Sequence, residues 1–441
     1  MIVVAETAVW VALLMAIWTA IASFAGGATG RAELVTSGER GLRVTFGFVA
    51  LAALGLLTAL LTRDFSIQHV ASFTSANLPL AQTITALWAG RDGALLLWTL
   101  LLGGCSVIAV HTNRERHAVL VPYLAGMLGL VLALALAALA FAANPFERLD
   151  WVPLDGRGMH PQLQNIAMAL HPPALYLGYA ASIIPFAFAA AARITGRRPD
   201  DWLAAVRPWV IAAWLFTTVG ILTGMWWAYA EPDWNGFWVW HAVGNGSVLP
   251  WLVNTVLLHV IVLREKRVAP ERTVYGGYVA YGGALLFLAA LVGFAFRSEH
   301  EITLRTGDAA ELRDPYGRSW RFVSEGVSRY DVLNRHVTAV ALAAYRGDMR
   351  VGLLASERRQ HVDSRGALTF EPASESAIIG SPLQDVYVAL AGVAEDDVAR
   401  LRISFNPLVW WVWFGGGILL LGGVLAVWPT LQARRAPAGD A

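Results

Sequence analysis

Cysteine is almost absent from this chain. Its 441 residues contain one, Cys105, which lies inside an apolar run. A single cysteine cannot form an intrachain disulfide, and the sequence contains neither a thiol pair nor a CxxCH haem-attachment motif. Any chemistry on paired cysteines would therefore use the cysteines of a partner protein.

Charged residues are also scarce, at 15% of the sequence. A soluble domain usually carries about 25%. The formal net charge is +1, and no cluster of basic residues suggests a nucleic-acid surface, so nucleic acid is not expected as a partner. The N-terminal MIVVAETAVW lacks the positively charged start of a cleaved signal peptide and is expected to begin a retained spanning helix.

Apolar residues, by contrast, make up 56% of the chain. They form long runs that can each cross a hydrocarbon core of about 30 Å, so the chain is expected to be embedded in membrane lipid. Hydropathy predicts about nine spans, at approximately residues 3–25, 43–62, 93–112, 119–142, 171–193, 207–229, 247–264, 274–296 and 407–429.

The distribution of arginine and lysine predicts the orientation. With nine spans, the basic segments all fall on one side, and cytoplasmic loops carry the excess of basic residues. These segments are 26–42, 113–118, 194–206, 264–273 and the C-terminal tail. The N-terminus is then outside and the C-terminus is cytoplasmic.

A polar stretch of about 110 residues, 297–406, precedes the last span. Alternating segments such as Val386–Leu390 indicate short strands. The expected fold is an all-α polytopic membrane protein with a small β-rich extracytoplasmic domain before its last helix. Its parts would be a helical bundle at 1–296, the β-rich domain at 297–406, and the last helix with its tail at 407–441.

Tryptophan is concentrated in one outer loop. Six of the nineteen tryptophans lie within residues 226–251, which read WWAYAEPDWNGFWVWHAVGNGSVLPW. Interfacial anchoring explains scattered tryptophans, but one helix end needs only one or two such anchors. A flat cluster of rings suits a large planar apolar ligand, and haem is the planar cofactor expected there.

Histidine is the complementary residue, because a neutral imidazole can ligate haem iron. His171 lies at the outer end of a span and is followed by two prolines. His259 lies inside an apolar helix, where an ionisable group is costly, so it is either functional or hydrogen-bonded between helices. His300 follows the eighth span and is either a surface residue or a ligand.

Several segments resemble one family of haem-handling membrane proteins. Residues 226–251 resemble the tryptophan-rich WWD signature shared by the CcmC, CcsA and CcmF families. Three other segments, Trp88–Trp98, Asn144–Leu149 and His171–Tyr179, resemble CcmF in order and spacing. The tail from about residue 275 to 430 resembles the CcmF C-terminal end, so the resemblance covers nearly the whole chain.

The resemblance implies a haem lyase of cytochrome c maturation in the bacterial inner membrane. Proteins of this kind receive haem at the outer, periplasmic face from the haem chaperone CcmE. Apocytochrome c is presented with reduced cysteines, aided by a CcmH-like thiol partner. The haem vinyl groups then form thioether bonds with the CxxCH cysteines.

The resemblance also implies site residues. His171 matches the first external ligand of the substrate haem iron. His259 matches the first ligand of a second, membrane-embedded haem b. The tryptophan-rich loop would hold the substrate haem through residues that include Trp226, Trp227, Trp234, Trp238, Trp240 and Asn245.

Some positions depart from the family pattern. Family members are longer, and the missing segment after His259 should contain the second external ligand, for which His300 is a displaced candidate. The second membrane ligand falls at Tyr281, which is either a ligand or a packed side chain. His241 and Gly244 replace two loop carboxylates, so His241 is either a new ligand or a space-filling residue. These departures leave open a non-catalytic membrane scaffold derived from the lyase.

Overall fold

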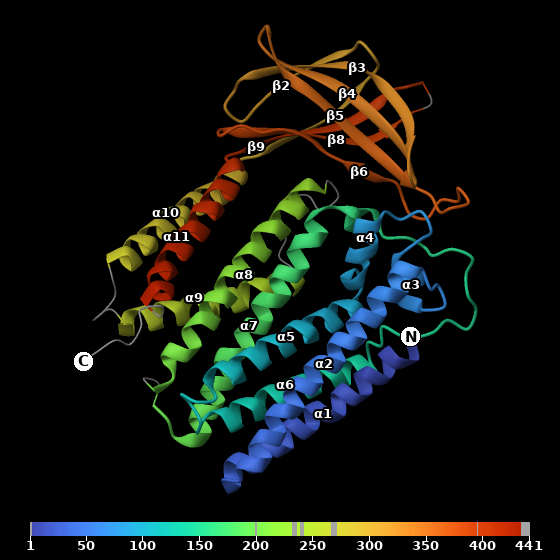
Figure 1. Ribbon diagram of the computed structural model, residues 1–441. Helices are drawn as coiled ribbons and strands as arrows, with labels where there is room; N and C mark the ends of the chain where they lie inside the picture. The colour runs from blue at the N-terminus through green and yellow to red at the C-terminus, as the bar shows by residue number, and fades with distance from the viewer. Residues whose placement is uncertain are drawn as a thin grey trace. The chain divides into compact units, whose positions relative to one another are not determined.

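The computed structural model describes most of the chain in two compact units (Figure 1). The first contains Met1–Thr223 and Trp240–Glu265, and the second contains Gly224–Val239 and Lys266–Ala441. The described residues are 2–198, 201–231, 236–238, 242–265, 271–394 and 396–433, and within the helices the side chains at 242–245, 262–265, 271–274 and 427–433 are not described.

Helices make up the first unit. They are α1 (Ile2–Thr29), α2 (Ala32–Thr62), α3 (Gln68–Phe73), α4 (Leu80–Thr85), α5 (Arg91–Asn113), α6 (Val121–Phe141), α7 (Ala167–Thr195), most of α8 (Leu203–Ala230) and α9 (Ala242–Glu265), with two 3₁₀ helices, η1 (Ala86–Trp88) and η2 (Pro161–Gln164). Among its described residues, the second unit contains the end of α8, then α10 (Glu271–Phe294), nine strands and α11 (Trp410–Ala433).

The chain is a polytopic helical membrane protein. Among the described residues, seven helices are long and apolar enough to cross a bilayer, namely α1, α2, α5, α6, α7, α8 and Tyr275–Phe294 of α10. Two shorter apolar stretches, Gly246–Ile261 and Trp410–Ala426, lie in α9 and α11, where the sequence predicts the remaining two of its nine spans.

Small residues allow α10 and α11 to pack at close range, side by side in Figure 1. A Cβ added at Gly283 would lie 2.4 Å from the Leu419 nitrogen, and one added at Gly422 would lie 2.3 Å from the Ala280 nitrogen. Close backbone approach at small residues is how membrane helices gain packing energy when both helices are otherwise apolar. The pair therefore depends on these glycines lacking side chains.

The nine strands form two antiparallel sheets between α10 and α11, which confirms the predicted β-rich domain. One sheet has the order β1-β9-β8-β7 and the other β2-β3-β4-β5-β6. The strands are β1 (Ser298–Leu304), β2 (Ala309–Arg313), β3 (Ser319–Val332), β4 (Arg335–Arg346), β5 (Met349–His361), β6 (Ala373–Glu375), β7 (Ala377–Ile379), β8 (Gln384–Val393) and β9 (Ala399–Pro407).

Alternating side chains give each sheet an inner, apolar face. Phe322 and Leu342 come from one sheet, and Ile403 and Phe405 come from the other; all four are fully buried in one cluster. The opposite face of β8 and β9 carries polar residues, including Ser404 and Asn406. That polar face lines a cleft in the second unit.

Candidate functional site

His171 lies in the second turn of α7 and is held in one orientation. Its Nδ1 is 2.7 Å from the backbone oxygen of Gly220 in α8. A carbonyl oxygen only accepts hydrogen bonds, so Nδ1 carries the proton of the neutral ring. The lone pair is then on Nε2, which is the form of histidine that ligates a metal.

The prolines after His171 leave a helix carbonyl without its usual donor. Pro172 has no N–H, so it cannot donate to the Met168 oxygen four residues earlier. The Trp88 indole N–H donates to that oxygen instead, at 2.8 Å. Two segments of the predicted motif set, around Trp88 and around His171, are therefore joined by a direct hydrogen bond.

His259 has the same tautomer as His171. Its Nδ1 is 2.7 Å from the Thr255 backbone oxygen, one turn earlier in α9, so Nδ1 again carries the proton. Of the predicted membrane ligands, Tyr281 lies on α10 with 53% of its surface exposed.

The tryptophan-rich loop begins at the end of α8, within the second unit. Trp226 is 39% exposed, whereas Trp227, Tyr229 and Phe237 are buried. The Phe237 ring lies 4.4 Å from that of Phe294, between centroids, and the Tyr229 ring lies 5.6 Å from that of Tyr387. Aromatic packing therefore holds two described stretches of the loop, 226–231 and 236–238, in this unit.

A buried hydrogen-bond network reinforces this packing. The Tyr229 hydroxyl donates to Asp385 Oδ2 at 3.1 Å and accepts from Asn406 Nδ2 at 3.0 Å. The Ser376 hydroxyl donates to the Ala230 carbonyl at 2.9 Å. Strand residues thus hold the last turn of α8 directly before the loop.

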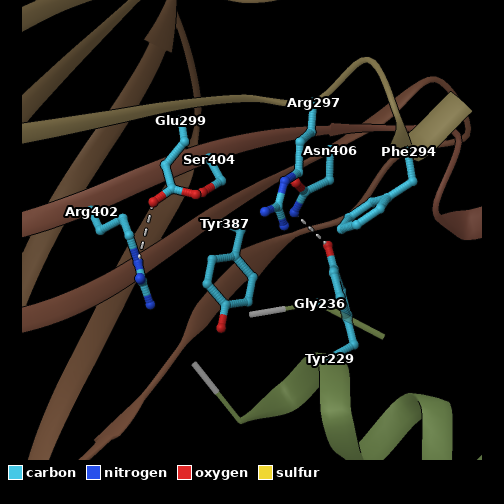
Figure 2. Close-up of a pocket in the computed structure, with 9 residues that line it drawn as sticks. All are labelled: Tyr229, Gly236, Phe294, Arg297, Glu299, Tyr387, Arg402, Ser404 and Asn406. Carbon is cyan, nitrogen blue, oxygen red and sulfur yellow. Dashed lines mark hydrogen bonds and ion pairs between the residues drawn. The ribbon is translucent and has the colours of Figure 1, made fainter. Parts of the chain in front are cut away.

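A cleft lies beside this network (Figure 2). It has a cavity volume of about 20 Å³ and is lined by Tyr229, Gly236, Phe294, Arg297, Glu299, Tyr387, Arg402, Ser404 and Asn406. Figure 2 shows the guanidinium groups of Arg297 and Arg402 on opposite sides of the Tyr387 ring. The cleft therefore combines aromatic walls with two cationic side chains.

Burial raises the pKa of the Asp385 carboxyl to about 6, although hydrogen bonds from Tyr229 and the Ser381 amide oppose the shift. The folded protein therefore binds more protons at this site than the unfolded chain between about pH 4 and 6. The stability that comes from the protonated Asp385 carboxyl is fully present below about pH 4. As the pH rises through 6 this carboxyl loses its proton, and the free energy of unfolding falls by at most about 3 kcal/mol.

Asp385→Asn is expected to flatten this pH dependence, because the amide does not titrate. Thermal unfolding of the full chain in detergent between pH 4 and 8 measures the effect. The exposed Asp396→Asn serves as the control. Equal pH dependence in wild type and Asp385→Asn would show that Asp385 does not titrate in this range.

Of the remaining predicted site residues, the structure describes some and not others. Trp238 is partly buried, and Trp234, Trp240 and His241 lie outside the described residues. Asn245 lies in α9, but its side chain is not described.

His300 lies on β1 with its ring 6.1 Å from that of Phe405, between centroids. Its Nε2 is buried without a hydrogen-bond partner among the described residues. Because neighbouring strand residues point to opposite faces, His300 faces the sheet interior, whereas Glu299 faces the cleft.

Five residues of this network and cleft carry no recognisable motif in the sequence: Tyr229, Arg297, Asp385, Arg402 and Asn406. In the sequence, Tyr229 is one member of the aromatic run, and Arg297 stands alone at the end of the eighth predicted span. The others lie in strands with no local motif. One available signal was the alternation in β9, which places Arg402, Ser404 and Asn406 on one face.

Comparison with known proteins gives consistent matches. The family model "Cytochrome C assembly protein" matches residues 45–298. The cytochrome c-type biogenesis protein ccl1 of Rhodobacter capsulatus is 37% identical over 279 residues, 62% of this chain and 42% of that protein. CcmF of Pseudomonas fluorescens is 41% identical over 224 residues, 50% of this chain and 34% of that protein. The matched segment therefore spans less than half of either relative.

A solved structure titled "Cytochrome c Heme Lyase CcmF" shares the fold. It aligns with a TM-score of 0.76 over 97% of this chain and 98% of that chain, at 19% identity. The predicted resemblance to CcmF is confirmed by the sequence matches.

Proposed function

Because the chain belongs to the cytochrome c assembly protein family, we propose that it handles haem and attaches it to apocytochrome c at the outer face of the bacterial inner membrane. The reaction would be addition of the two CxxCH thiols across the haem vinyl groups. Each addition forms a carbon–sulfur bond and moves the thiol hydrogen to the neighbouring vinyl carbon.

The observation that carries this proposal is the fixed tautomer of His171. Its Nδ1–H donates to the Gly220 carbonyl, so the Nε2 lone pair is the one suited to haem iron. In metal sites, a hydrogen bond on the second ring nitrogen orients the imidazole and raises its basicity. We propose His171 as an axial ligand of the substrate haem. His300 is the weaker candidate for a second ligand, because its ring faces the sheet interior.

The tryptophan-rich loop is proposed to hold the haem plane. Trp226, Trp227 and Trp238 belong to the part of the loop that the structure describes, and Trp234, Trp240, His241 and Asn245 complete the proposed set. The rings offer flat apolar contact for a porphyrin.

We further propose that His259 holds a membrane-embedded haem b, with Tyr281 as the candidate second ligand. The Thr255 carbonyl fixes the His259 tautomer as Gly220 does for His171. When bound, haem b would supply electrons that keep the substrate iron ferrous.

The proposed arrangement has nine spans, counting α9 and α11, with the N-terminus outside and the C-terminus cytoplasmic. The β-rich domain would then lie outside the membrane. Its proposed partners are a CcmE-like haem chaperone, a CcmH-like thiol protein and apocytochrome c.

An alternative function is a non-catalytic membrane scaffold. Its support is the replacement of two loop carboxylates of the family signature by His241 and Gly244. The two functions differ in whether the chain restores haem attachment.

The test replaces the haem lyase of a bacterial host with this chain and stains membrane proteins for covalently bound haem. Staining above that of lyase-deficient cells is expected if the chain is a lyase. Staining equal to that of deficient cells, with the chain present in the membrane, would favour the scaffold.

A further inference from the structure

The cleft in Figure 2 has side chains suited to binding a carboxylate. Arg297 and Arg402 both line it, and Glu299 is the one acidic side chain among the lining residues. Arg402 Nε lies 3.8 Å from Glu299 Oε1, so that carboxylate offsets part of the charge of one guanidinium. Each guanidinium has five N–H donors, which allows it to bind a further acceptor beside its existing contacts.

Both arginines are held in place by their surroundings. The Arg297 guanidinium carbon lies 5.1 Å from the centre of the Phe294 ring. Arg402 projects from β9, where it pairs across the strands with Glu301 on one side and Ala389 on the other. A preorganised guanidinium loses less freedom when it binds a carboxylate, often through two parallel hydrogen bonds.

Gly236 of the tryptophan-rich loop lies close to Arg297. Gly236 has φ +126°, a conformation that favours glycine, and a Cβ there would lie 3.2 Å from the Phe294 ring and 3.7 Å from Arg297 Nη1. The loop backbone therefore approaches the Arg297 guanidinium closely.

The cleft also contains an unused acceptor. Asn406 is 4% exposed, and its Oδ1 has no hydrogen-bond partner among the described residues, although its Nδ2 donates to Tyr229. A buried acceptor without a donor is costly, so a bound water that donates to Oδ1 is expected there. The cavity volume of about 20 Å³ has room for about one water-sized polar group.

We propose that this cleft binds a carboxylate arm of a flat aromatic ligand, with Arg297 and Arg402 as its donors. This inference rests on the proposed function, under which the arm is a haem propionate. Arg297 and Arg402 would then bind the polar edge of the porphyrin.

The test compares haem with its dimethyl ester, which has the same ring but no ionisable arm. Each ligand is titrated by Soret absorbance into the full chain in detergent, as wild type, Arg297→Gln and Arg402→Gln. Wild type is expected to bind haem roughly 10-fold or more tightly than the ester, as for a charge-assisted hydrogen bond. Each variant is expected to lose that preference by weakening haem binding and leaving ester binding unchanged.

Arg305→Gln is the matched control, because Arg305 is an exposed arginine of the same domain that pairs with Asp396 at 3.0 Å. It is expected to leave both affinities unchanged. Equal affinity of wild type for haem and ester would overturn the carboxylate site and leave the proposed function standing. If Arg297→Gln and Arg402→Gln weakened the binding of haem and of its ester equally, the carboxylate site would also be overturned, because the substitutions would then act on the structure and not on the carboxylate.

Two further outcomes separate the sources of the carboxylate. Displacement of bound haem by millimolar succinate, with no effect on bound ester, supports the site. Succinate binding by wild type with no preference for haem over ester would assign the cleft to free carboxylates and overturn the proposal. Absence of binding by either porphyrin would contradict the proposed function itself.

Discussion

His171→Ala is expected to reduce covalent haem attachment to background. Loss of a group that only orients a metal ligand typically costs about 10–100-fold in affinity or activity, and loss of the ligand itself should cost at least as much. The Gly220 carbonyl would also lose its hydrogen bond from Nδ1. The measurement is haem staining of c-type cytochromes in the lyase-replacement host.

His111→Ala is the control, because His111 lies exposed in the last turn of α5. It should leave staining unchanged. His171→Gly with added imidazole separates ligation from packing, since imidazole can supply the missing nitrogen without restoring the side chain. Normal staining in His171→Ala would contradict the assignment of His171 as an iron ligand.

Gly283→Leu is expected to disrupt the pairing of α10 with α11. Its Cβ alone would lie 2.4 Å from the Leu419 nitrogen and 2.6 Å from the Gly415 oxygen, both backbone atoms that cannot rotate away. Overpacking commonly costs about 1–3 kcal/mol, and a clash with backbone should lie at or above the upper end. Thermal unfolding and limited proteolysis of the full chain in detergent measure the loss.

The adjacent Gly282→Leu is a closely matched control. A Cβ at Gly282 meets no atom within 4 Å, so the same change in hydropathy and helix propensity occurs without the clash. The unfolding temperature should fall in Gly283→Leu and stay near wild type in Gly282→Leu. Equal unfolding temperatures in the two variants would show that α10 and α11 do not pack through Gly283.

The helices and the β-rich domain could be predicted because their signals are local. Long apolar runs define spans, and period-two alternation defines strands such as β8 and β9. The count of nine rests on α9 and α11, whose described apolar stretches, Gly246–Ile261 and Trp410–Ala426, are shorter than those of the other spans.

The details of the site depend on contacts between distant residues, which a single sequence does not display. Tyr229 is separated by 156 positions from Asp385 and by 177 from Asn406. Likewise, no pattern around His171 reveals that its Nδ1 bonds to Gly220, 49 positions later. The motifs of the sequence point to His171, but only the fold shows which of its ring nitrogens carries the proton.

Haem binding through histidine can be measured by optical spectroscopy of the purified protein. The full chain would be purified from a haem-replete host, and its reduced-minus-oxidised spectrum and pyridine haemochrome would be recorded. We expect a haemochrome signal and the sharp bands of a histidine-ligated haem, and we expect His259→Ala to remove the membrane haem component. A spectrum without haem bands from correctly folded protein would contradict haem binding by this chain.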